Sequence, residues 1–155
     1  MGRVVLSHVP GAGVSQYRYD PCGRLVFSCD LVYGQRHFSY DLAGQLVAAT
    51  NSAGGVSQYG YDRCGRLVTR TDPGGGLTTY QYNECGQMIA ATDPLGRVTE
   101  YTWDKSGTLA AITRPDGTVV SRRLGPKGVE EYIDDQLVSR ILITPTTRTV
   151  TIDDY

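Results

Sequence analysis

The sequence predicts an all-β protein, a meander of antiparallel β-hairpins built from a 21-residue repeat. A decapeptide, best seen at residues 59–68, recurs in five copies, and the second aromatic residue of each copy falls at positions 19, 40, 61, 82 and 103. Turn-forming residues separate short runs in which apolar and polar residues alternate, as in half-buried strands. No apolar period of 3.6 residues competes with this alternation.

Each copy of the decapeptide reads as two strands joined by a tight turn. In the first copy Asp20 opens the turn and Gly23 closes it, which suits a three-residue loop with a left-handed glycine. This loop would place Tyr19 opposite Leu25 and would place residue 17 opposite residue 27. We therefore expect the aromatic residues of each copy to share one face of the sheet and to pack against their cross-strand partners.

Five positions of each copy are expected to be structural: the two aromatic residues, the residue that opens the turn, the turn glycine and the Leu or Met that follows. These positions are Tyr17, Tyr19, Asp20, Gly23, Leu25, Phe38, Tyr40, Asp41, Gly44, Leu46, Tyr59, Tyr61, Asp62, Gly65, Leu67, Tyr80, Tyr82, Asn83, Gly86, Met88, Tyr101, Trp103, Asp104, Gly107 and Leu109.

A second turn follows each hairpin, at residues 51–54, 72–75, 93–96 and 114–117. If this loop had the same odd length as the first, the aromatic residues of successive copies would fall on opposite faces. A loop of even length or a β-bulge would keep them on one face, and we expect a four-residue loop. Within the strands, Gly60 is expected to accept a side chain, whereas Gly65 at the turn is not.

Residues 1–117 hold the five repeats, and residues 118–155 read as a degenerate repeat that continues the same sheet. Gly128 keeps the register of the turn glycines. A shorter hairpin is expected from residues 129–133 to 136–141 through Asp134 and Asp135, followed by a strand at residues 146–152. The strands at residues 13–19 and 148–152 would be the open edges of the sheet, which predicts self-association or pairing with a related chain.

Composition excludes several classes of protein. The 155 residues suit one domain, and a net charge of −1 leaves no field that would attract nucleic acid or anionic lipid. No membrane span and no signal peptide are recognised. The four cysteines are expected to be free thiols, because the repeat keeps Cys22, Cys64 and Cys85 too far apart for a disulfide. No cysteine or histidine spacing suggests a metal site.

The sequence predicts no enzymatic activity, no catalytic residue and no cofactor. The Asp of each copy is explained by its place at the start of a turn, and His8 and His37 have no motif-spaced partner. No phosphate-binding glycine motif is present. The tyrosine rows leave one binding alternative open, a surface for carbohydrate or for a partner protein. A glycan array with Tyr59→Ala and Tyr80→Ala variants would test it.

The Tyr-x-Tyr-Asp-x-x-Gly-Arg-Leu copies and their Thr-Asp-Pro-x-Gly links, over residues 13–117, resemble the YD repeats of bacterial Rhs proteins. Similar repeats occur in toxin-complex proteins and in animal teneurins. The resemblance implies an arc of an open spiral or shell that encapsulates or presents a toxin or effector cargo in bacterial competition.

The same resemblance implies a further Rhs-type chain or a toxin cargo as partner. It also suggests a secreted or cell-surface-delivered bacterial protein, although the sequence itself leaves the localisation unknown. A remnant of a larger Rhs gene is a second alternative to the shell segment.

Overall fold

The computed structural model describes residues 3–9, 13–31, 33–125 and 128–142, and every regular element in them is a β-strand. The strands follow one another as hydrogen-bonded neighbours in sequence order, from β1 to β14, which confirms the all-β meander. Their bounds are β1 Val4–Val9, β2 Gly13–Tyr19, β3 Leu25–Asp30, β4 Gly34–Tyr40, β5 Leu46–Thr50, β6 Val56–Tyr61, β7 Leu67–Thr71, β8 Leu77–Tyr82, β9 Met88–Thr92, β10 Val98–Trp103, β11 Leu109–Thr113, β12 Val119–Gly125, β13 Gly128–Ile133 and β14 Gln136–Leu142.

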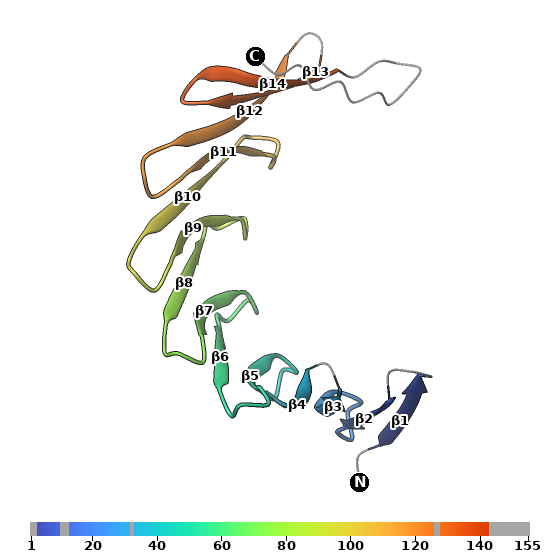
Figure 1. Ribbon diagram of the computed structural model, residues 1–155. Coiled ribbons are helices and arrows are strands. Elements are labelled where there is room, and N and C mark those ends of the chain that lie inside the picture. Colours follow the sequence, from blue (N-terminus) through green and yellow to red (C-terminus); the bar gives the residue numbers. More distant parts are fainter. Residues whose placement is uncertain (1–2, 10–12, 32, 126–127, 143–155) are drawn as a thin grey trace. The chain divides into compact units, whose positions relative to one another are not determined.

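Contacts between Cα atoms divide the chain into two compact units, residues 1–79 and 80–155, and the division falls within β8. In each unit, consecutive strands lie side by side and are antiparallel (Figure 1). The described residues contain no helix that is long and apolar enough to cross a membrane.

Both kinds of turn are three-residue loops, so the expected four-residue loop is wrong. In nine turns the residue that opens the turn donates its N–H to the carbonyl four residues later, and its own carbonyl accepts the N–H of the turn glycine. The opening residues are Asp20, Asp41, Asn51, Asp62, Asp72, Asn83, Asp93, Asp104 and Arg114. The turn glycines of these loops have φ angles between +78° and +88°, which side chains with a Cβ disfavour.

A β-bulge keeps the aromatic residues on one face in spite of the odd loops. The register shifts by one residue beside the second aromatic residue, as at Tyr61, where Tyr61 pairs with Leu67 but Gly60 pairs with Thr69. The same shift stands beside residues 19, 40 and 103. One extra residue per hairpin cancels the odd parity of the second loop, so the bulge replaces the even-length loop that we expected.

The bulge also corrects the predicted partner of Tyr17. Tyr19 pairs with Leu25 as predicted, but Tyr17 pairs with Ser28, and Phe27 pairs with Arg18 on the other face. There the guanidinium of Arg18 lies 4.5 Å from the centre of the Phe27 ring, and the ring of His37 meets the Phe27 ring edge-on, with 5.0 Å between the ring centres.

Very little of the described chain is buried. Phe27, 7% exposed, is the one buried hydrophobic residue among the described residues, and Ser28 and Glu130 are the buried polar residues. Cohesion therefore comes from strand pairing and from contacts between successive copies, not from a central core.

The edge and the degenerate repeat differ in part from the prediction. Residues 13–19 are not an edge, because β1 pairs with β2 from Val4–Arg18 to Val9–Gly13. The hairpin from residues 129–133 to 136–141 is confirmed as β13 and β14, with positive φ angles at Asp134 and Asp135. Gly128 is not a turn glycine of the repeat type, since it begins β13 with a φ of +146°. The predicted strand at 146–152 lies outside the described residues.

Candidate functional site

The carboxylates that open the turns are bound within their own loops. In the third copy, Oδ1 of Asp62 accepts the N–H groups of Cys64 and Arg66, at 2.9 and 3.0 Å. Oδ2 of Asp62 accepts Nε of Arg66 at 2.7 Å. Asp20 and Asp93 hold the arginine four residues later in the same way, at 2.6 and 2.7 Å. In these three turns the aspartate that opens the turn and the arginine four residues later therefore form a closed local unit.

These hydrogen bonds lower the pKa of the carboxyl groups. For Asp20, Asp62 and Asp93 the largest cause of the lowered pKa is the backbone N–H of the arginine four residues later, followed among the lowering causes by its side chain. Ser106 lowers the pKa of Asp104 through a hydroxyl hydrogen bond, and the backbone N–H of Thr118 lowers that of Asp116. All five groups are stabilised as carboxylates.

We expect the protein to lose stability in acid because of these turns. A carboxyl whose pKa is lower in the folded state contributes stability above its unfolded pKa, and the contribution disappears as the pH falls through the folded pKa. Urea melts between pH 7 and about pH 2 should show this loss below about pH 4. The chain itself suggests a matched variant, Asp62→Asn, because Asn83 makes the same Oδ1 contact with the N–H of Gln87. This variant should depend less on pH, and equal slopes for both proteins would contradict the assignment.

The second aromatic residue of a copy binds the backbone of the copy before it. The hydroxyl of Tyr40 donates to the Leu25 carbonyl and that of Tyr61 to the Leu46 carbonyl, both at 2.9 Å. Trp103 uses its indole N–H in the same way and donates to the carbonyl of Met88 at 2.7 Å. Each of these bonds spans fifteen residues and joins two neighbouring hairpins.

Strand pairing explains why these carbonyls are available. The pairing of β5 with β6 runs from Thr50–Val56 to Ala48–Gln58, so it ends two residues away from Leu46. The pairing of β9 with β10 likewise stops at Ala90, two residues before Met88. Where the ladder stops, the aromatic side chain supplies the donor that the next strand does not.

Sequence reasoning assigned the aromatic residues to packing and missed this hydrogen bond. A signal was present, because the second aromatic position holds Tyr or Trp in all five copies, whereas the first position accepts Phe38. Only aromatic residues with an N–H or O–H group can serve at the second position. The role could therefore have been inferred by comparing the two columns of the repeat.

Other side chains add links between copies. Nη1 of Arg24 donates to the carbonyl of Asp41 at 3.0 Å, and its guanidinium lies 5.0 Å from the ring centre of Tyr40. Nε2 of Gln45 donates to the carbonyl of Gly65 at 3.1 Å. The residue after the turn glycine thus reaches the turn of the next copy.

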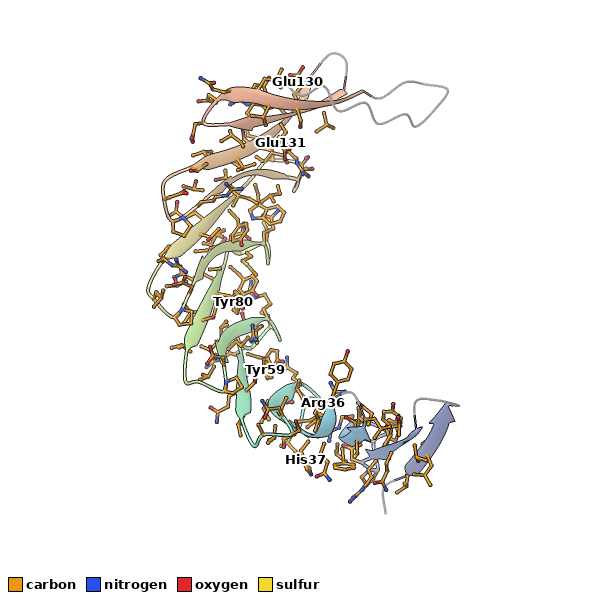
Figure 2. The ribbon with its side chains drawn as sticks, viewed as in Figure 1. Arg36, His37, Tyr59, Tyr80, Glu130 and Glu131 are labelled. Atoms are coloured by element: carbon orange, nitrogen blue, oxygen red, sulfur yellow. The ribbon has the colours of Figure 1, made fainter. Side chains whose placement is uncertain are left out.

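The remaining predicted positions fall into two groups. The five turn glycines of the decapeptides all have positive φ. The first aromatic residues lie within strands, and Figure 2 labels two of them, Tyr59 and Tyr80. Phe38 pairs with Ala49, Tyr59 with Arg70 and Tyr101 with Ile112. Tyr59 and Tyr80 are half-buried.

No group of three or more His, Cys, Asp or Glu side chains in the described part of the chain is placed to hold a metal ion. All four cysteines are free thiols, and Cys22, Cys64 and Cys85 are exposed beside their turn glycines, whereas Cys29 is half-buried in β3.

We expect all four thiols to react with a thiol reagent in the denatured, unreduced protein, because the repeat separates them. In the native protein the three exposed turn cysteines should react faster than Cys29. Thiol titration with and without a reductant measures this. Two thiols that appear only after reduction would contradict the strand arrangement.

Comparison with known proteins agrees with the repeat. The sequence matches the RHS Repeat family over residues 40–77, 65–98 and 82–119, which together span more than half of the chain. No curated protein matches it.

Solved structures of Tc toxins share the fold. A TcdB2-TccC3 crystal structure aligns with a TM-score of 0.66 and 16% identity, covering 83% of this chain and 8% of that chain. A Photorhabdus luminescens Tc holotoxin pore aligns with a TM-score of 0.52 and 13% identity, covering 98% of this chain and 11% of that chain. The chain therefore spans about a tenth of the length of these structures. With the repeat period, the turn geometry and the family match in agreement, the chain belongs to the RHS repeat family.

Proposed function

We propose that the chain is a non-catalytic wall segment of an Rhs-type β-shell that encloses or presents a toxin or effector cargo in bacterial competition. The observation that supports this most is the hydrogen bond from the second aromatic residue of one copy to the carbonyl of the copy before it. Such a bond lets a sheet grow by adding identical hairpins, each fixed to the last, without a core that limits its size.

The low burial of the side chains supports a role as a wall segment. With a single buried hydrophobic residue among those described, the strands have partly accessible side chains on both faces. The carboxylates of Asp20, Asp62 and Asp93 are bound by their own turns. The hydroxyls of Tyr40 and Tyr61 are also already used within the sheet, which favours a structural role over sugar binding for these two residues.

Isolation of the native assembly from the cells that produce this chain would test the shell role. We expect the chain to co-purify with a cargo polypeptide that resists protease until the assembly is denatured. A chain that migrates at its own mass, with no associated polypeptide, would contradict the proposal.

We expect the isolated chain to associate through its edge strand. β1 pairs with β2 on one side, and its Val4 and Leu6 are 53% and 67% exposed. Sedimentation between about 5 and 100 μM should show a mass that rises with concentration. Leu6→Lys should reduce the association, because a lysine on an edge strand opposes pairing. Val56→Lys, at an exposed valine of the inner strand β6, should not. A strictly monomeric protein, or equal effects of the two variants, would contradict edge pairing.

A further inference from the structure

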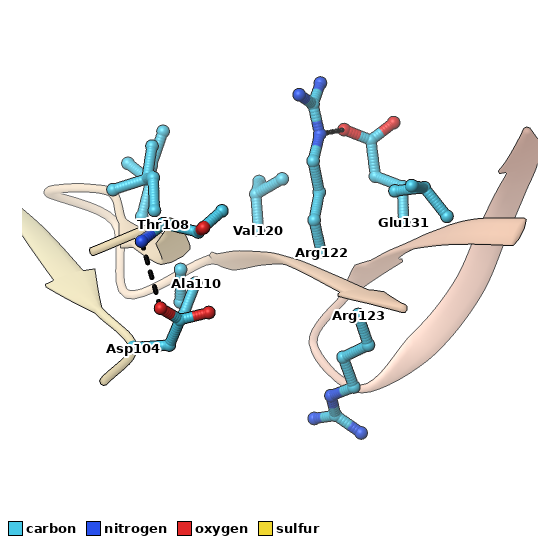
Figure 3. Close-up of a pocket in the computed structure, with 11 residues that line it drawn as sticks. Asp104, Thr108, Ala110, Val120, Arg122, Arg123 and Glu131 are labelled. Atoms are coloured by element: carbon cyan, nitrogen blue, oxygen red, sulfur yellow. Dashed lines mark hydrogen bonds and ion pairs between the residues drawn. The ribbon is translucent and has the colours of Figure 1, made fainter. Parts of the chain in front are cut away.

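The second unit has a cavity of about 410 Å³ beside β11, β12 and β13 (Figure 3). Leu109, Ile112 and Val120 belong to its apolar lining, and Asp104, Arg122 and Glu131 add charge. Figure 3 shows Arg122 and Glu131, joined by an ion pair of 3.2 Å, on one side of Val120 and Asp104 on the other. The volume is within the usual range for a ligand pocket, about 300–1,000 Å³.

The cavity occupies a place that an aromatic ring fills elsewhere in the repeat. In the first unit Tyr61 donates to the carbonyl of Leu46, and burial followed by the proximity of Tyr59 and Asp41 raises its pKa. Three periods downstream of Asp41, Leu46 and Tyr59 stand Asp104, Leu109 and Arg122, three of the residues that line the cavity.

The aromatic residue of this place is missing from the sequence. Twenty-one residues after Trp103 stands a leucine, Leu124, which has no side-chain hydrogen-bond donor. In the repeat, position 124 corresponds to the second aromatic residue of the five preceding copies. Within the part of the chain that the structure describes, the sixth copy therefore has a cavity beside Leu109 and no Tyr or Trp at the repeat position that would fill it.

The carbonyl that would receive the donor is placed as in the other copies. β11 pairs with β12 from Thr113–Val119 to Ala111–Ser121, and the pairing stops two residues before Leu109. Pairing with the following strand likewise ends two residues away from Leu25, Leu46 and Met88. An aromatic side chain donates a hydrogen bond to the carbonyl of each of these three residues.

We propose that this cavity binds a tyrosine or tryptophan side chain of a second polypeptide. The ring lies on Leu109, Ile112 and Val120, and its O–H or N–H donates to the carbonyl of Leu109. The occupant is a polypeptide side chain because the three equivalent places, at the carbonyls of Leu25, Leu46 and Met88, are each filled by an aromatic side chain from an extended strand. Asp104 and the Arg122–Glu131 pair at the cavity supply hydrogen-bonding groups for the backbone of that partner. The site does not depend on the shell role.

Methyl NMR of the full chain tests the aromatic specificity. N-acetyltyrosinamide and N-acetyltryptophanamide should shift the methyl signals of Leu109, Ile112 and Val120 in a saturable way. N-acetylphenylalaninamide is the matched control, since it lacks one oxygen, and it should bind about fivefold more weakly. Equal affinity for the tyrosine and phenylalanine amides, or no shift with any of them, would overturn the proposal.

A peptide of residues 57–62 of this chain tests the polypeptide source, because it presents Tyr61 in its own strand. We expect the peptide to bind more tightly than the free amide and its Tyr61→Phe form about fivefold more weakly than the parent peptide. A Tyr59→Phe peptide, altered at the first aromatic position, should bind like the parent. If the amide binds and the peptide does not, the occupant is a small aromatic molecule and the proposal of a polypeptide partner is wrong.

A variant with an aromatic side chain at position 124 should compete with the added probe for the cavity. Leu124→Tyr restores the repeat residue and should reduce the affinity for the tyrosine amide at least about tenfold. Should this variant fail to fold, the tyrosine and phenylalanine probes on the wild-type chain still decide the question. A folded Leu124→Tyr chain with unchanged affinity would show that the probe binds elsewhere.

Discussion

Replacing Trp103 with alanine should destabilise the second unit by about 2–3 kcal/mol, less than the loss for a fully buried tryptophan because the ring is half-buried. The change removes both the ring and the N–H that donates to the carbonyl of Met88 at 2.7 Å. The carbonyl of Met88 then loses the hydrogen bond from the indole, and this loss adds to the free energy lost with the packing of the ring. Urea melts should be followed by circular dichroism, because Trp103 is the only tryptophan and its loss removes the fluorescence signal.

The neighbouring residue Thr102 provides the control. Thr102 is exposed on the opposite face of β10 and pairs with Ala111. Thr102→Val keeps the branched shape and should change the free energy of unfolding by less than about 0.5 kcal/mol. If both variants had the same small effect, the hydrogen bond between copies would not stabilise the sheet as described.

Gly75→Ala should cost about 1–2 kcal/mol, whereas Gly74→Ala, one residue earlier in the same turn, should be neutral or slightly stabilising. Gly75 has a φ of +87°, and a Cβ there would meet no atom within 4 Å, so the cost comes from the backbone conformation alone. Gly74 does not have positive φ, and Cys22, Cys64 and Leu95 hold the same position in other turns.

Circular dichroism during urea unfolding measures both glycine variants. Equal free energies of unfolding for the two would mean that the turn does not depend on a left-handed residue at its fourth position. This pair is a sharper comparison than Gly65 and Gly60. A Cβ at Gly60 would collide with Oγ1 of Thr69, so the expectation that Gly60 accepts a side chain loses its basis, and a Cβ at Gly65 would approach Nε2 of Gln45 to 3.1 Å.

The sequence by itself determined the order of the strands and the positions of the turns within residues 13–117, and it determined the family. These features are local, since Asp20 opens its turn and Gly23 closes it through hydrogen bonds within five residues. The 21-residue period then repeats the same local solution along the chain. The hairpin of β13 and β14 was predictable for the same reason, because Asp134 and Asp135 suit a two-residue turn.

The tertiary structure decided which residues meet across strands. The bulge beside Tyr61 changes every partner beyond it, and neither the loop lengths nor the pattern of apolar residues distinguishes a bulge from a longer loop. The hydrogen bond from Tyr61 to Leu46 depends on where the pairing of β5 with β6 stops, fifteen residues away in sequence. Likewise, a leucine at position 124 reads as simple decay of the repeat. The structure shows a cavity beside Leu109, and the missing aromatic residue can be related to that cavity. The sequence could not reveal the cavity, because its lining comes from several strands that meet only in the folded chain.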